Sequence, residues 1–104
     1  MNNLLQKLKL NGAHMDDKKV LTLGQLQTLA DANYSDISWS NNDCASFGSD
    51  CLRYELFVNL RTDNASDEFH AVHYKDGEDC IFFYSSESLA HCLAAIECHK
   101  GGLI

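Results

Sequence analysis

The side chains with the greatest capacity for chemistry are the five cysteines and five histidines of this chain. Thiolates and imidazoles bind zinc, but a structural zinc site usually takes two ligands from one turn, separated by about two to four residues. Cys44 and Cys51 are seven positions apart, and Cys92 and Cys98 are six positions apart. This spacing favours cysteines that are buried as small hydrophobic residues, and it predicts neither a metal site nor a cofactor.

A cysteine nucleophile is the second candidate, with Cys80 activated by His73 if a hairpin places them opposite each other. Such chemistry also needs a group that orients the base and an oxyanion hole, and the sequence points to neither. His70 and His73 are three positions apart on an expected strand, so they face opposite sides and do not share a ligand. We therefore expect no enzyme, with a small metal- or thiol-dependent enzyme as the alternative.

Negative charge is the third candidate feature. The chain has 15 acidic residues against 8 basic ones, a net charge of −7. This charge repels phosphate backbones and favours basic partners, so direct binding to nucleic acid is not expected. An odd number of cysteines without an export signal predicts reduced thiols, and no apolar run approaches the ~20 residues of a membrane span. We expect a cytoplasmic protein of the host cell.

The candidate cysteine, histidine and acidic residues lie mostly on or between predicted strands. Apolar residues at every second position predict a strand over 52–60 with one buried face. Further strands are expected at 69–75 and 80–84, joined by a tight turn at Asp76-Gly77, and a short one at 36–40. Residues 41–50, rich in Asn, Asp, Ser and Gly, are predicted to be a loop. The strands then form an antiparallel meander of three to four strands.

The register of the last hairpin decides which side chains are buried together. A two-residue turn at Asp76-Gly77 would place Val72 opposite Ile81 and His73 opposite Cys80. A shift of one residue would exchange the two faces, so the inner face of this hairpin is left open.

Helices are predicted on both sides of the strands in the sequence. The first runs from Asn3 to Leu10, and a polar connector follows over 13–19. A capping box at Thr22 and Gln25 begins the second, which ends near Ala32. The last is capped by Ser85 or Ser86 and stops after Lys100, with an apolar stripe of Leu89, Cys92, Leu93 and Ile96. Residues 1–104 are thus expected to form a single α+β domain with all three helices packed on the sheet.

The meander predicts where the acidic residues gather. Its first and third connections emerge at the same end of the sheet, which would collect Asp43, Asp50, Asp76, Glu78 and Asp79 there. Trp39 and Phe47, in or beside the same loop, would supply aromatic anchors for a partner. The alternative is that charged loops only maintain solubility. Phe57, on the polar face of its strand, is expected to lie under an N-terminal helix, with a partner-binding patch as the alternative.

In length, acidity, hairpin-then-helix order and lack of catalytic motifs, the chain resembles the small inhibitors carried by phages, the anti-CRISPR proteins in particular. The resemblance implies a non-enzymatic protein that binds a CRISPR effector subunit and blocks its nucleic-acid or nuclease site. An immunity protein against a toxin nuclease would share these properties. A homodimer formed through an uncovered sheet face is a further alternative.

Overall fold

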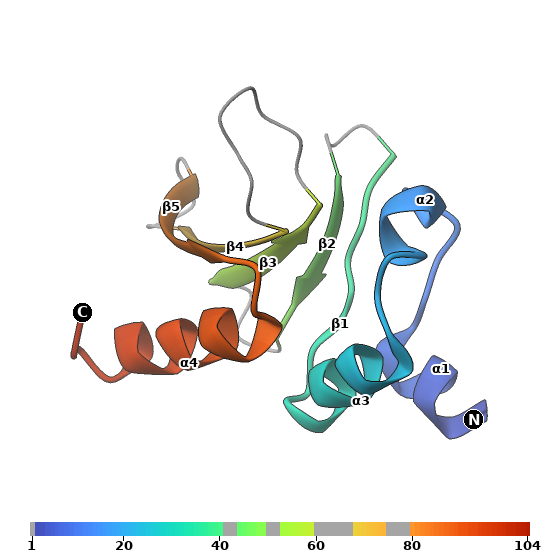
Figure 1. Ribbon diagram of the computed structural model, residues 1–104, viewed down its shortest axis with the longest axis horizontal. Coiled ribbons are helices and arrows are strands. Elements are labelled where there is room, and N and C mark those ends of the chain that lie inside the picture. The colour runs from blue at the N-terminus through green and yellow to red at the C-terminus, as the bar shows by residue number, and fades with distance from the viewer. Residues whose placement is uncertain (1, 41–43, 50–52, 60–67, 75–79) are drawn as a thin grey trace.

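Five strands form one antiparallel sheet in the order in which they occur along the chain, β1-β2-β3-β4-β5 (Figure 1). The computed structural model describes residues 2–40, 44–49, 53–59, 68–74 and 80–104. The helices are α1 (Asn2–Leu8), α2 (Met15–Lys18), α3 (Leu23–Asp31) and α4 (Leu89–Lys100). The strands are β1 (Ser35–Asp36), β2 (Ala45–Gly48), β3 (Tyr54–Val58), β4 (Phe69–Tyr74) and β5 (Cys80–Ser86). The predicted α+β meander is confirmed, with one strand more than expected.

The additional strand is β2, which lies in the segment that the sequence indicated to be a loop. Its four residues are all buried, and Phe47 pairs with Leu56 while Ala45 pairs with Val58. Small and polar residues have low intrinsic strand propensity, but pairing with a neighbouring strand and burial of Phe47 outweigh that preference. The loop prediction for this part of 41–50 was therefore wrong.

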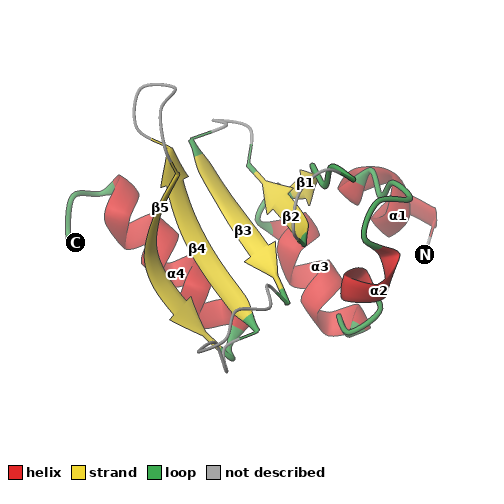
Figure 2. Ribbon diagram, turned by 90° about the horizontal axis from the view of Figure 1, so that it is seen from above, coloured by secondary structure: helices red, strands yellow, loops and turns green. Residues whose placement is uncertain are grey.

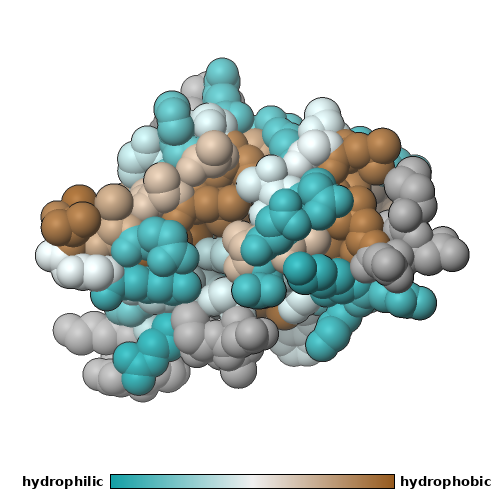
Figure 3. Space-filling model, turned by 90° about the horizontal axis from the view of Figure 1, so that it is seen from below, coloured by the Kyte–Doolittle hydropathy of each residue, from teal (hydrophilic) through white to brown (hydrophobic). Residues whose placement is uncertain are grey.

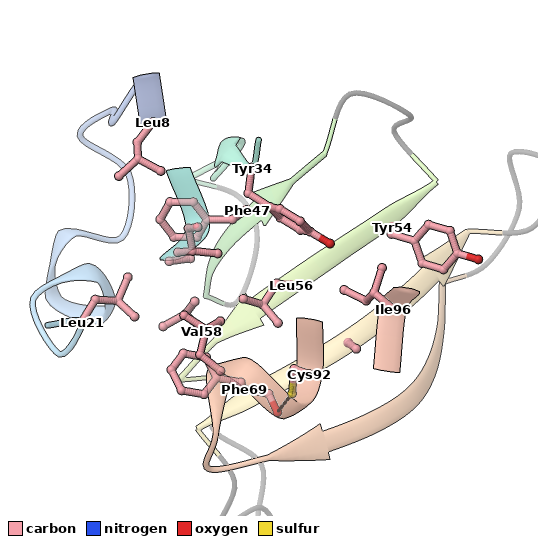
Figure 4. Packing of buried hydrophobic residues seen from close by; sticks show 14 of the residues in the cluster. Leu8, Leu21, Tyr34, Phe47, Tyr54, Leu56, Val58, Phe69, Cys92 and Ile96 are labelled. Atoms are coloured by element: carbon pink, nitrogen blue, oxygen red, sulfur yellow. Dashed lines mark hydrogen bonds between the residues drawn. The ribbon is translucent and has the colours of Figure 1, made fainter. Parts of the chain in front are cut away.

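The alternating pattern of β3 divides the sheet into two faces as predicted. Tyr54, Leu56 and Val58 are buried, while the residues between them are half-buried. Figure 4 shows Leu56 and Val58 among side chains contributed by the helices, including Leu8 of α1 and Cys92 and Ile96 of α4. These contacts bury the apolar stripes of short helices that would be marginal in isolation.

The helices occupy different parts of the sheet. In Figure 2, α4 crosses β4 and β5, whereas α1, α2 and α3 gather at the β1 end. Phe57 lies on the face opposite Leu56, and its ring packs edge-on against Phe82 of β5 at a centroid distance of 5.5 Å. The helical side chains join the cluster around Leu56 and Val58 instead. The expected helical cover over Phe57 is thus replaced by a contact with the neighbouring face of β5.

The β4–β5 pairing differs from the predicted register by one residue. His73 lies opposite Ile81, Cys80 lies opposite Tyr74, and Val72 lies opposite Phe82. An irregularity between Ala71 and Val72 changes the register again along the same strand pair. Such a bulge places two residues of one strand against one of its partner, which a period-two pattern does not reveal. The predicted pairing of His73 with Cys80 was therefore wrong.

The helix signals are confirmed where they depend on local hydrogen bonds. Thr22 Oγ1 accepts from Gln25 N at 3.0 Å, Gln25 Oε1 accepts from Thr22 N at 2.8 Å, and Asn33 has a left-handed φ of 65°. Ser88 caps α4 in place of Ser85 or Ser86, because those two residues belong to β5. The predicted connector over 13–19 contains α2. Across the described ranges, every helix is too short or too polar to cross a bilayer.

Candidate functional site

The five acidic residues of the predicted site lie outside the described residues, but the strand ends that flank them are defined. Glu55 of β3 pairs with Gly48 at the end of β2, and Tyr54 pairs with His73 of β4. Tyr74, the last residue of β4, pairs with the first residue of β5. The described strand ends that flank the segments 50–52 and 75–79 therefore lie at the same end of the sheet. We call these two segments the acidic segments; they contain Asp50, Asp76, Glu78 and Asp79.

Asp43 is separated from this group by β2. The prediction assumed no strand between Asp43 and Asp50, so that one loop held both residues. The described strand begins at Ala45, which pairs with Val58 at the opposite end of the sheet from Gly48. Because an antiparallel strand carries the chain from one end of the sheet to the other, the flanks of Asp43 and Asp50 lie at different ends. Asp43 itself lies outside the described residues, so its place in one acidic pole with the others stays a prediction, which β2 does not favour.

The two aromatic residues of the predicted site have different environments. Trp39 is 62% exposed, and its carbonyl oxygen lies 2.9 Å from His14 Nε2. Two residues before Trp39, the N–H of Ile37 donates to Ser46 O. Since β1 runs antiparallel to β2, the chain after Ile37 runs toward the Ala45 end of β2. Phe47 is 0% exposed and belongs to the core. Of the two aromatic residues, Trp39 alone is available to a partner in this conformation, and it lies at the end opposite the flanks of the acidic segments.

The excess negative charge is concentrated in the sequence between the strands. The segments 41–43, 50–52, 60–67 and 75–79 contain seven acidic and two basic residues, a net charge of −5 out of the −7 of the whole chain. The described body carries eight acidic and six basic residues. The folded elements are therefore close to neutral.

Two histidines and a tyrosine meet at the sheet end from which the acidic segments depart. Tyr54 Oη lies 2.7 Å from His99 Nδ1, and the rings of His73 and His99 have centroids 4.7 Å apart. The ring of Phe83 lies 4.6 Å from that of His99, and Lys100 Nζ lies 5.5 Å from the centre of the Tyr54 ring. No local sequence pattern links His99 to Tyr54, because 45 residues separate them. The cluster joins the end of α4 to the sheet.

Glu55 lies at the same end of the sheet, on the other face, and the pKa of its carboxyl group is shifted. Glu55 is next to Tyr54 in β3 and points away from the core. Burial raises the pKa of Glu55, and a hydrogen bond with Tyr74 opposes that rise. Desolvation disfavours the ionised form, which explains the direction of the shift.

Two of the cysteines that can be described are buried, as the sequence predicted for small hydrophobic residues. These are Cys44 and Cys92, and Cys98 is half-buried. Cys92 Sγ donates a weak hydrogen bond to Phe69 O at 3.6 Å. Among the residues with defined positions, no three His, Cys, Asp or Glu side chains are arranged to hold a metal ion.

Comparisons of this chain with protein-family models, with curated proteins and with solved structures gave no match.

Proposed function

We propose that this chain is a small, non-enzymatic inhibitor that binds a basic, nucleic-acid-handling protein and occupies the surface where phosphates would lie. A CRISPR effector subunit is the partner class that the sequence resemblance suggests. The proposal depends on one observation, the separation of a nearly neutral folded body from inter-strand segments that carry a net charge of −5. The acidic segments are the proposed contact region, because the described strand ends that flank them lie at one end of the sheet.

The physical basis is electrostatic complementarity. Carboxylates presented on short connections between paired strands can enter a groove lined by lysine and arginine, where they replace phosphate oxygens. Complementary charge speeds the encounter and makes the affinity fall as salt concentration rises. The described residues carry a net charge of only −2, which limits electrostatic repulsion from acidic parts of the partner. Trp39 lies at the opposite end, so it has no part in this contact.

The test compares two variants with the same net charge. The first neutralises the acidic segments with Asp50→Asn, Asp76→Asn, Glu78→Gln and Asp79→Asn. The matched control removes four charges next to strand ends of the opposite end of the sheet, with Asp43→Asn, Asp63→Asn, Asp67→Asn and Glu68→Gln. Binding is measured by calorimetry against a panel of purified CRISPR effector complexes, over a series of salt concentrations.

We expect the first variant to bind at least about tenfold more weakly, a loss of about 1.4 kcal/mol, and to show a shallower salt dependence. The control should stay within about threefold of the unmodified chain, which corresponds to less than 1 kcal/mol. Equal losses in both variants would show that only net charge matters, and unchanged binding in both would remove the electrostatic proposal. Inhibition of an isolated toxin nuclease, with no effect on any effector, would instead assign the chain to the immunity proteins.

A further inference from the structure

We infer that β5 and the groove beside it are a docking surface for a second copy of this chain, which extends the sheet by antiparallel pairing of β5 with β5. This inference is independent of the proposed inhibitor function, because it uses a different part of the molecule. It differs from a homodimer formed through an uncovered sheet face, because the contact uses the edge of the sheet at β5.

The two edges of the sheet differ in length and protection. β1 pairs over two residues, whereas β5 has seven residues and is bordered by β4 alone among the described strands. Its side chains include exposed apolar residues, namely Ile81 at 47%, Phe82 at 48% and Tyr84 at 39%. Natural sheets usually protect an edge with charged residues, proline or a covering segment. The sequence of β5, Cys-Ile-Phe-Phe-Tyr-Ser-Ser, contains neither charge nor proline.

A groove continues this apolar edge onto α4. It has a volume of about 310 Å³ and is lined by Tyr84, His91, Ala94, Ala95, Cys98 and Ile104. Figure 3 shows hydrophobic residues over the part of the molecule where α4 and the C-terminus lie. The alanine side chains allow a second helix to approach α4 closely. A pair of edge strands alone is a small interface, and contact between the two α4 helices supplies the additional buried area that a stable dimer needs.

The absence of charged side chains from this surface favours a second copy of the chain as the partner that binds there. Neither β5 nor the lining of the groove includes Asp, Glu, Lys or Arg. Two chains that each carry a net charge of −7 repel each other, so a surface without acidic side chains is where two copies meet with the least repulsion. A basic partner, in contrast, would be matched by acidic side chains around the groove.

Symmetry provides a further argument for self-association. A twofold dimer uses the same patch on both subunits, so that patch must be complementary to itself. Phe82 lies on the Phe57 face of the sheet, and Tyr84 lies on the face that carries α4. Antiparallel pairing of β5 with β5 of the partner subunit would therefore gather the two Phe82 rings on one face of the extended sheet and the two Tyr84 rings, beside the α4 helices, on the other.

Analytical ultracentrifugation of the full chain tests the inference at about 50 mM and at about 500 mM salt. Electrostatic repulsion is weakly screened at the first concentration and strongly screened at the second. We expect a monomer–dimer equilibrium whose Kd falls as salt rises, because screening reduces the repulsion between the two acidic bodies. Phe82→Lys should weaken the dimer at least about tenfold, or about 1.4 kcal/mol. The matched control is Trp39→Lys, which places the same charge on an exposed aromatic position away from β5 and should leave the dimer unchanged.

A second variant tests the dimer without any change to the sequence of β5. Ala94→Glu introduces a carboxylate on the exposed face of α4 inside the groove, and it should also dissociate the dimer while circular dichroism stays unchanged. A chain that remains monomeric at about 100 μM at both salt concentrations would overturn the inference, because that level lies well above a micromolar Kd. Equal dissociation by the Trp39 control would also overturn it.

The acidic-segment variant separates this inference from the proposed inhibitor function. Removing its four carboxylates should weaken binding to a basic partner but strengthen self-association. The salt dependences are likewise of opposite sign, so either proposal can fail without the other.

Discussion

Lys18 of α2 and Asp36 of β1 form an ion pair whose side chains are only 4% and 0% exposed. The carboxylate of Asp36 also accepts from the backbone N–H groups of Asn11 and Ser38, each at 2.9 Å. Lys18 Nζ donates to Asn11 O at 2.8 Å. This pair therefore connects the segment between α1 and α2 to the short first strand.

Breaking this buried pair from one side should be strongly destabilising. Asp36→Asn leaves the ammonium of Lys18 without its counter-charge, and we expect a loss of about 3–5 kcal/mol in the free energy of unfolding measured with urea. Lys19→Met is the control, because Lys19 and its partner Asp16 are 71% and 95% exposed and should contribute little. The double variant Lys18→Met/Asp36→Leu should lose less than the sum of its single variants. Simple additivity would show that the two charges do not interact.

The stability of the fold should depend on the protonation of Glu55. Its folded-state pKa is raised above 4.5, so the native state binds the proton more tightly than the unfolded state. Stability therefore falls as the pH rises from about 4.5 through the folded-state pKa, and it becomes constant above that pKa. Glu55→Gln should lose this decline in urea unfolding measured across a pH series. Glu87→Gln, on an exposed residue, is the control, and an identical response in both variants would contradict the assignment to Glu55.

The contact between Tyr54 and His99 should stabilise the attachment of α4 to the sheet. Tyr54→Phe removes the phenol oxygen that lies 2.7 Å from His99 Nδ1 and keeps the ring contacts. We expect a loss of about 0.5–1.5 kcal/mol in the free energy of unfolding. Tyr84→Phe, at an exposed position of β5, should have a smaller effect. Equal effects in the two variants would show that the hydrogen bond contributes nothing specific.

The capping box of α3 should contribute measurably to the free energy of unfolding. Thr22→Ala removes the hydroxyl that accepts from Gln25 N at 3.0 Å, and we expect a loss of about 1 kcal/mol in thermal or urea unfolding. Thr22→Ser retains the hydroxyl and should restore most of that loss. A serine variant as unstable as the alanine variant would indicate that the methyl group of Thr22, and not its hydroxyl, matters.

Local signals in the sequence were sufficient for several elements. The start of α3 depends on hydrogen bonds between Thr22 and Gln25, three residues apart, and the buried face of β3 depends on a period of two. Both patterns are contained in a short stretch of chain, so they can be identified without knowing what surrounds them. The α+β class and the meander order followed from the same kind of information.

Features that depend on distant residues were decided only by the tertiary structure. Ala45–Gly48 becomes a strand because β1 and β3 supply hydrogen-bonding partners on its two sides, despite a composition typical of loops. That strand then separates Asp43 from Asp50, and the irregularity in the β4–β5 pairing separates His73 from Cys80. The sequence by itself determined how much negative charge the chain carries and which segments hold it. Which strand ends flank those segments, and which strand lies at the apolar edge of the sheet, depended on cross-strand pairing, because the stability of a strand comes from neighbours that are far away in the chain.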